Sequence, residues 1–340
     1  MRTLYYYMPM TTPEVSTNNP LLDVRDLSVW FSTPEAKYQV VSHISFSVRK
    51  GEVFGLVGES GCGKSITALS ILGIQPQQAV REGSILFNGR DLVKLPEEEM
   101  RSVRGKDIGM VFQEPMTSLN PVLTVGYQVA EALLAHFDIS RKEALAKAVE
   151  LLRAVKIPSP ELRIKDYPHQ MSGGMRQRVM IAMAIACDPA FLIADEPTTA
   201  LDVTIQFQIL KLMQEMRQKL GMAVLLITHD LSIVSEHADS VAIMYAGRIV
   251  EHASVRELFA DPLHPYTIGL MHSLPRARGI ALKPIPGFVP PPYNLPKGCT
   301  FSDRCFAVID ACRTEEPALR EIRPGHFARC IRAGSLPTEA

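Results

Sequence analysis

Gly58-Glu-Ser-Gly-Cys-Gly-Lys64-Ser65 is the stretch of sequence from which the fold and the chemistry are most directly inferred. It matches the pattern G-x-x-x-x-G-K-S/T in full, and it lies between a predicted strand, Val53–Val57, and a predicted helix, Ile66–Leu72, as the pattern requires. Glycines let the backbone curl so that several N–H groups face one phosphate at the positive end of the helix. Lys64 would reach the β- and γ-phosphates, and Ser65 would ligate Mg²⁺. A chance glycine-rich turn is the alternative, and the motifs elsewhere in the chain disfavour it.

Outward from this loop, short β-rich runs alternate with helical ones from Leu21 to about Leu274, the pattern of an α/β fold with a largely parallel sheet. Between Glu131 and Ala186 we expect helices only, with an amphipathic one over Arg141–Val155. This interval is predicted to be a helical insertion in the α/β core. The predicted strands are Val53–Val57, Ser84–Phe87, Ile108–Phe112, Phe191–Ala194, Ala223–Thr228 and Ser240–Tyr245.

Polar side chains follow three of these strands. Asp195 and Glu196 come after Phe-Leu-Ile-Ala, His229 closes another strand and Gln113 follows a third. In phosphate-loop enzymes one carboxylate supports Mg²⁺ and a group beside the γ-phosphate orients the attacking water, roles that suit Asp195 and Glu196 respectively. In open parallel sheets ligands gather at the carboxyl ends of the strands, although each of these residues alone could equally make a structural cap or hydrogen bond.

A second glycine motif, Met171-Ser-Gly-Gly-Met175-Arg-Gln-Arg178, leads into a helix of small apolar residues. Ser172 can cap that helix, and the two glycines allow close backbone approach to a phosphate. By itself the motif predicts only a capped helix start.

The order of these motifs, with Ala200-Leu-Asp202 between Glu196 and His229, resembles the ATP-binding cassette of ABC transporters over roughly residues 21–274. The resemblance implies an α/β fold: an ABC-type P-loop NTPase core with an antiparallel β subdomain, a helical subdomain at about residues 114–187, and ATP hydrolysis with Mg²⁺. It also implies a head-to-tail dimer, in which the Ser-Gly-Gly signature of one cassette closes over the ATP held by the phosphate loop of the other.

Carried over to this chain, the resemblance assigns residues to four roles. Glu196, His229, Gln113 and Lys64 would be the catalytic residues. Ser65, Gln113 and Asp195 would bind Mg²⁺. The ATP-binding residues are Phe31, Gly58, Glu59, Ser60, Gly61, Cys62, Gly63, Lys64, Ser65 and Ile66. The partner's ATP would meet Ser172, Gly173, Gly174 and Met175, and Asp202 would lie at the dimer seam.

Two of these assignments depend on local features of this chain. The family places an aromatic face against adenine, and Phe31 fits best by its spacing from Ile44, with Tyr38 as the alternative. Met175 stands where the family signature usually has Gln, so one side-chain hydrogen bond is lost there. Because the glycines and Ser172 keep their donors, we expect ATPase activity to survive.

Several further stretches resemble the dipeptide and oligopeptide importer branch of that family, which also includes importers of nickel and oligosaccharides. They include Gln113-Glu-Pro-Met-Thr-Ser-Leu-Asn-Pro121, His264-Pro-Tyr-Thr-Ile-Gly-Leu270 and Gly325-His326. The implied partners are a second cassette subunit, a different chain by family analogy, two transmembrane permease subunits and, indirectly, an extracytoplasmic solute-binding protein. The residues after Gln113 would meet the membrane subunits, at the cytoplasmic face of the inner membrane.

Composition bears on the alternative functions. Lys plus Arg (36) equals Asp plus Glu (36), so the chain gives no reason to expect nucleic acid as a partner. A non-transport ABC ATPase would carry coiled-coil, zinc-hook or tandem-cassette insertions, which this chain lacks. A module that only holds ATP is disfavoured by Glu196 and His229. No apolar run approaches the about 18 to 20 residues that span a bilayer, and residues 1–20 resemble a flexible lead-in rather than a secretory signal.

The tail has a composition of its own. A Pro-rich linker is predicted over residues 275–298, followed by a Cys-rich extension over 299–340. Cys299, Cys305, Cys312 and Cys330 have the spacing C-x5-C-x6-C-x17-C, which suits either an iron–sulfur cluster or a tetrahedral Zn²⁺, or else unligated thiols. Resemblance to peptide-importer subunits favours a 4Fe-4S cluster. Two other cysteines, Cys62 and Cys187, are expected to fill the loop and the core.

Overall fold

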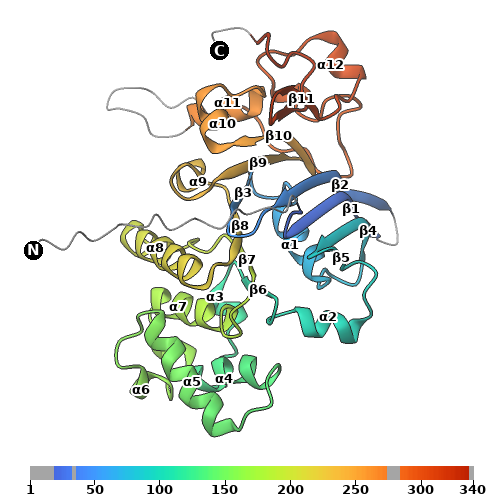
Figure 1. Cartoon of the computed structure of the whole chain (residues 1–340). Coiled ribbons are helices and arrows are strands. Elements are labelled where there is room, and N and C mark those ends of the chain that lie inside the picture. Colours follow the sequence, from blue (N-terminus) through green and yellow to red (C-terminus); the bar gives the residue numbers. More distant parts are fainter. Residues whose placement is uncertain (1–18, 33–35, 274–283, 337–340) are drawn as a thin grey trace, which may run out of the picture.

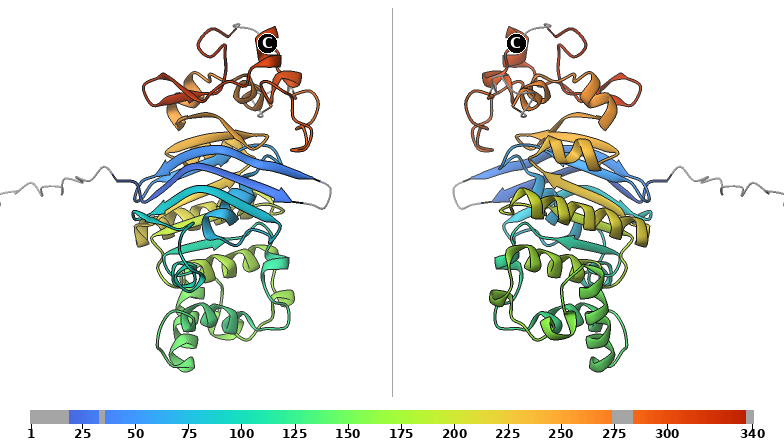
Figure 2. Two further views of the ribbon diagram at one scale, coloured as in Figure 1. Left: turned by 90° about the vertical axis from the view of Figure 1, so that its right-hand side faces the viewer. Right: turned by 90° about the vertical axis from the view of Figure 1, so that its left-hand side faces the viewer.

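A computed structural model of the chain describes residues 19–32, 36–273 and 284–336. Most of the predicted lead-in and part of the predicted linker lie outside these residues. Helices α3 to α7 lie at one end of the molecule and the segment after residue 284 lies at the other, with two sheets between them (Figures 1 and 2). Among the described residues, no helix combines the length and the apolar character needed to cross a bilayer.

Two sheets form the centre of the molecule. The smaller is antiparallel, in the order β2-β1-β4-β5, and its strands are β1 (Leu22–Ser32), β2 (Lys37–Val48), β4 (Ala79–Phe87) and β5 (Arg90–Asp91). The larger has the order β11-β12-β10-β9-β3-β8-β7-β6. Its parallel strands are β9 (Ser240–Tyr245), β3 (Val53–Val57), β8 (Ala223–Thr228), β7 (Phe191–Asp195) and β6 (Ile108–Val111).

The remaining strands of the larger sheet are antiparallel and come from late in the chain. They are β10 (Arg248–Ser254), β11 (Arg320–Arg323) and β12 (His326–Ala328). Because β12 pairs with β10, the Cys-rich segment is joined by backbone hydrogen bonds to the sheet that carries the phosphate loop. The predicted parallel pairing is therefore found from β6 to β9, and the strands beyond β9 pair antiparallel.

The helices cover the sheets or form the insertion. Around the sheets lie α1 (Lys64–Leu72), α2 (Glu97–Val103), α8 (Val203–Leu220), α9 (Leu231–His237), α10 (Val255–Ala260) and α11 (Pro265–His272). The insertion holds α3 (Pro115–Ser118), α4 (Val125–Leu134), α5 (Arg141–Ala154), α6 (Pro160–Arg163), η1 (Pro168–Gln170) and α7 (Gly173–Ala184). The tail adds η2 (Ser302–Arg304) and α12 (Asp310–Thr314).

Most predicted elements are confirmed, with shifted ends. Three strand predictions match β3, β8 and β9 residue for residue, and the interval expected to be helical contains no strand. The predicted strand Ile108–Phe112 ends one residue early, and Phe112 is exposed. The strand predicted from Ser84 begins at Ala79, because its first half pairs with β1 in the smaller sheet, a pairing that local sequence does not report. The predicted amphipathic helix ends at Ala154, and it begins with a capping box formed by Ser140 and Glu143.

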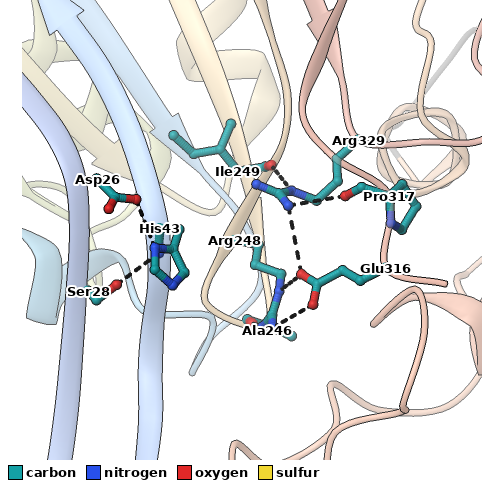
Figure 3. A network of polar contacts seen from close by, with 9 residues as sticks. All are labelled: Asp26, Ser28, His43, Ala246, Arg248, Ile249, Glu316, Pro317 and Arg329. Atoms are coloured by element: carbon teal, nitrogen blue, oxygen red, sulfur yellow. Dashed lines mark hydrogen bonds and ion pairs between the residues drawn. The ribbon is translucent and has the colours of Figure 1, made fainter.

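An ion-pair network fastens the tail to the start of β10 (Figure 3). Glu316 accepts hydrogen bonds from the guanidinium of Arg248, and Arg329 lies 3.7 Å from the same carboxylate. Arg329 also donates to the carbonyl oxygens of Ile249 and Pro317, both at 3.1 Å. These contacts hold the tail on the sheet independently of the cysteines.

Candidate nucleotide-binding and active site

The phosphate loop lies between β3 and α1, and α1 packs between β1 of the smaller sheet and β7 of the larger one. Glycine is required at its first position, because a Cβ on Gly58 would lie 2.1 Å from the carbonyl oxygen of Met244. Gly61 and Gly63 have positive φ angles of 79° and 107°, a conformation that other residues adopt only with strain. The loop therefore takes its shape from glycine at three positions, two of which, Gly58 and Gly63, are specified by the motif.

Lys64 folds back over this loop. Its Nζ donates to the carbonyl oxygens of Gly58 (2.7 Å) and Glu59 (3.0 Å), and the side chain is almost completely buried. The ammonium group is thus held at the centre of the curled backbone. That is the place from which it would meet the phosphates of a nucleotide.

Glu196 lies at the centre of the predicted catalytic residues. Its carboxylate accepts a hydrogen bond from Gln113 Nε2 at 3.3 Å, lies 3.3 Å from His229 Nδ1, and lies 4.0 Å from Lys64 Nζ. Thr199 Oγ1, which no sequence motif identified, donates to the same carboxylate at 2.8 Å. The backbone of Glu196 has a positive φ of 46°, a strained conformation of the kind that is concentrated at functional sites. The ends of β6, β7 and β8 thus bring the predicted catalytic group together.

Asp195 next to it has the surroundings of a metal ligand. Its side chain is buried, and its Oδ1 has no hydrogen-bond partner. Burial raises the pKa of Asp195, while the hydrogen bond from Ser65 lowers it. A buried carboxylate oxygen without a partner is costly, and a hard cation such as Mg²⁺ would satisfy it. Ser65 and Asp195 therefore fit the predicted magnesium site, with the side-chain oxygen of Gln113 as a third donor of the right chemistry.

The signature motif forms a second polar group, away from the phosphate loop. Ser172 caps α7 by accepting a hydrogen bond from the Met175 backbone at 3.4 Å, and Asp202 caps α8 in the same way. A Cβ on Gly174 would come within 2.8 Å of Ile205, so α7 and α8 approach closely there. Within the described part of the chain, no hydrogen bond or ion pair joins Ser172, Gly173 or Gly174 to the phosphate loop.

Both candidates for the adenine-binding face lie on one aromatic surface. The rings of Phe31 and Tyr38 are stacked, with centroids 6.1 Å apart and an interplanar angle of 10°. Tyr293, which was not predicted, adds an edge contact to Tyr38 at 6.4 Å. Phe31 on β1 and Tyr38 on β2 are paired across the two strands. The two candidates for the adenine contact therefore do not exclude each other.

Two further residues, for which no role at the nucleotide site was predicted, touch the phosphate loop at Glu59. Tyr266 Oη accepts a hydrogen bond from the Glu59 backbone at 3.0 Å, and Arg304 Nη1 donates to the Glu59 carboxylate at 3.1 Å. They lie 207 and 245 residues away along the chain, so no local signal could have revealed the contacts.

The four tail cysteines line one small pocket, together with His264 and Phe301. Burial raises the pKa of Cys305 to about 11, and the neighbouring thiols add to the rise. Burial likewise raises the pKa of Cys330 to about 11. Across the described residues, no three His, Cys, Asp or Glu side chains form a group that could hold a metal ion. The other two cysteines, Cys62 and Cys187, are buried as predicted.

Comparisons with known proteins agree with this geometry. Residues 41–199 match the family described as ABC transporter, and residues 250–312 match the oligopeptide/dipeptide transporter C-terminal region. A probable peptide ABC transporter ATP-binding protein of Sinorhizobium fredii is 54% identical over 93% of this chain and 96% of its own length. The oligopeptide transport ATP-binding protein OppD of Escherichia coli is 48% identical over 92% of this chain and 93% of its own length.

Solved structures give the same result for the cassette. A dimeric ATP-binding cassette bound to ADP and phosphate superposes with a TM-score of 0.62 at 25% identity, covering 69% of this chain and 99% of that one. The CbiO1 protein of Clostridium perfringens, part of an ABC transporter complex, gives 0.60 at 28% identity, covering 72% and 92%. The chain belongs to the ATP-binding subunits of the dipeptide and oligopeptide branch of ABC transporters.

Proposed function

We propose that this chain is the ATP-hydrolysing motor subunit of a peptide importer. The observation that carries the proposal is the convergence of Gln113, His229 and Lys64 on the Glu196 carboxylate, beside the buried Asp195 and the half-buried Ser65. ATP would lie along the phosphate loop, with Lys64 at its β- and γ-phosphates and the Phe31–Tyr38 face against adenine.

The roles in hydrolysis follow from this geometry. Water attacks the γ-phosphorus, the bond to the β–γ bridging oxygen breaks, and Glu196 orients the water and accepts its proton. His229 and Gln113 hold the Glu196 carboxylate in place from two sides. Mg²⁺, held by Ser65, Asp195 and Gln113, would neutralise charge on the phosphates.

One chain supplies only half of a complete site. Ser172, Gly173, Gly174 and Met175 would contact the ATP of a second cassette, and Asp202 would lie at the seam. The separation of this signature from the chain's own phosphate loop supports the assignment, as does the dimeric form of the related cassette solved with ADP and phosphate. We propose a different chain as the partner.

The transported solute is proposed from the relatives, which are named for peptide and oligopeptide transport. No comparison favours nickel or oligosaccharides, or a non-transport ATPase. Two transmembrane permease subunits, which this chain would meet at the cytoplasmic face of the inner membrane, and indirectly an extracytoplasmic solute-binding protein complete the proposed importer. The exposed side chains of Met116 and Val122, which follow Gln113, support a contact surface for the permeases. The proposed domain boundaries remain 21–274 for the cassette, 275–298 for the linker and 299–340 for the extension.

Replacement of Glu196 by Gln tests the catalytic assignment. The amide cannot accept the proton of water, so we expect hydrolysis to fall by about 10² to 10⁴-fold while ATP stays bound. Phosphate release and retained radiolabelled ATP are measured on the complex isolated from membranes. Glu236→Gln, at an exposed carboxylate on α9, is the matched control and keeps wild-type turnover. Unchanged hydrolysis in the Glu196 variant would refute the assignment.

We further propose a 4Fe-4S cluster in the cysteine pocket. Four thiols around one pocket are the donor set that such a cluster requires, and no other function is evident for their clustering. A cube of four irons and four sulfides needs ligands farther apart than a single ion does. The proposal therefore rests on the donor set and on its clustering around one pocket, since no group able to hold a metal ion is formed among the described residues.

The iron content of protein purified without oxygen tests this proposal. We expect a brown protein with about four irons per chain and a broad visible absorption band, both lost when Cys312 is replaced by Ser. The matched control is Cys187→Ser, at a buried cysteine outside the pocket, which keeps the iron. A colourless, iron-free wild-type protein would eliminate the cluster.

A further inference from the structure

Two residues from late in the chain, Tyr266 and Arg304, hold the phosphate loop at Glu59. Glu59 donates its backbone N–H to Tyr266 of α11 and receives a hydrogen bond on its carboxylate from Arg304 of η2. The carbonyl oxygen of the same Glu59 accepts a hydrogen bond from Lys64 Nζ at 3.0 Å. A displacement of Glu59 would therefore also displace an anchor of the lysine that is proposed to meet the phosphates.

Arg304 is itself fixed in place. Its side chain is only 7% exposed, although guanidinium groups usually remain in solvent. Besides Glu59, it donates to the Pro286 carbonyl at 2.8 Å and to Tyr245 Oη at 3.4 Å. The guanidinium also lies over the rings of Tyr245 and Phe301, at 5.6 and 5.9 Å from their centroids. A buried guanidinium with this many partners is held in one position. A shift of the tail would therefore also shift the Glu59 carboxylate that it contacts.

The position of the Arg304 side chain depends on the folded tail around it. Cys305 directly follows Arg304, and Phe301 both packs against the tilted ring of Tyr266, at 5.4 Å between centroids, and lines the cysteine pocket. A continuous set of contacts thus runs from the pocket wall through Arg304 to Glu59. The exposed ion pair between Arg323 and Asp261 also links the tail to the cassette, but it touches no residue of the phosphate loop.

We propose that Arg304 is a positioning residue for the phosphate loop, so that the folded tail sets the affinity of the chain for ATP. The proposal rests on the proposed function, because it assumes that ATP binds at this loop. Without Arg304, the loop spends part of its time in conformations that do not bind, and the apparent affinity falls by that fraction. The guanidinium is favoured over a lysine because its planar fork can bond Glu59 and the Pro286 carbonyl at once.

Titration of the full-length chain with a fluorescent ATP analogue tests the proposal. We expect Arg304→Met and Glu59→Gln each to weaken binding by about tenfold, which corresponds to about 1.4 kcal/mol. The double variant should be no weaker than either single variant, since both remove the same contact. Arg304→Lys should recover part of the loss, and Arg323→Met should bind within about twofold of wild type.

The possible results distinguish failure of the Arg304 proposal from failure of the proposed ATP-binding function. Wild-type protein that does not bind the analogue would refute the proposed function itself. Wild-type affinity in Arg304→Met, or additive losses in the double variant, would refute only the role of Arg304. Urea unfolding is measured alongside, and if Arg304→Met does not fold, Glu59→Gln and Arg304→Lys decide. Weaker binding in Glu59→Gln at an unchanged unfolding midpoint supports positioning, and wild-type affinity in both variants overturns it.

Discussion

Among single residues, Glu196 illustrates how tertiary contacts define a candidate catalytic group. Its position after a buried strand made it a candidate, but its partners come from three other segments: Gln113, His229 and the phosphate-loop lysine. Thr199 completes the set from three residues away. The sequence predicted which residues would be polar at the strand ends, whereas only the fold showed that one carboxylate connects them.

Gly58→Ala gives a test of the loop geometry at the same scale. The added Cβ would lie 2.1 Å from a backbone oxygen of β9 and 2.7 Å from Cys62 Sγ, and a backbone atom cannot rotate away. We expect the free energy of unfolding to fall by about 3 kcal/mol. ATP affinity should fall with it, because the loop must shift. Urea unfolding and nucleotide titration measure the two effects.

Gly221→Ala is the matched control for this change. Gly221 has a positive φ of 65°, and a Cβ added there would meet no atom within 4 Å, so only backbone strain is introduced. That strain costs about 1 kcal/mol and leaves ATP affinity unchanged. Equal losses in the two variants would mean that the contact with β9 does not constrain the loop.

Among the elements, β10 connects the cassette to the tail. Glu251 on β10 is fully buried and accepts hydrogen bonds from the backbone of Leu263 (2.7 Å) and His264 (2.9 Å), and its Oε1 lies 2.7 Å from Nε2 of His326 on β12. One carboxylate thus holds the start of α11 and the last strand of the sheet. Because α11 carries Tyr266, this junction also supports the contact with the phosphate loop.

Replacing Glu251 by Leu leaves two backbone donors and a histidine buried without their acceptor. We expect the free energy of unfolding to fall by about 3 to 5 kcal/mol, as when one partner of a buried pair is removed. Glu98→Leu, at an exposed position of α2, makes the same chemical change and should cost less than about 0.5 kcal/mol. Urea denaturation followed by circular dichroism measures both, and similar midpoints would show that β10 does not depend on this carboxylate.

Over the whole molecule, the sites lie in an order that suits a motor subunit. The helical insertion, which includes α7, lies at one end of the molecule and the tail lies at the other (Figures 1 and 2). Asp195 and Glu196, the candidate catalytic carboxylates, lie at the carboxyl end of β7 in the sheet between them. The tail extends the same sheet and reaches the phosphate loop through Arg304. Events at the cysteine pocket and at the nucleotide site are therefore physically connected within one chain.

The sequence by itself determined the phosphate loop, the central strands, the helical insertion and the order of the candidate catalytic residues. These features depend on local patterns: glycines where the backbone must curl, and apolar runs where strands are buried on both faces. Only the tertiary structure decided that β4 belongs to the antiparallel sheet, that the tail pairs with β10, and that Tyr266 and Arg304 meet Glu59. These contacts join residues far apart in the chain, and their partners are chosen by packing and buried charge, which no local pattern of residues encodes.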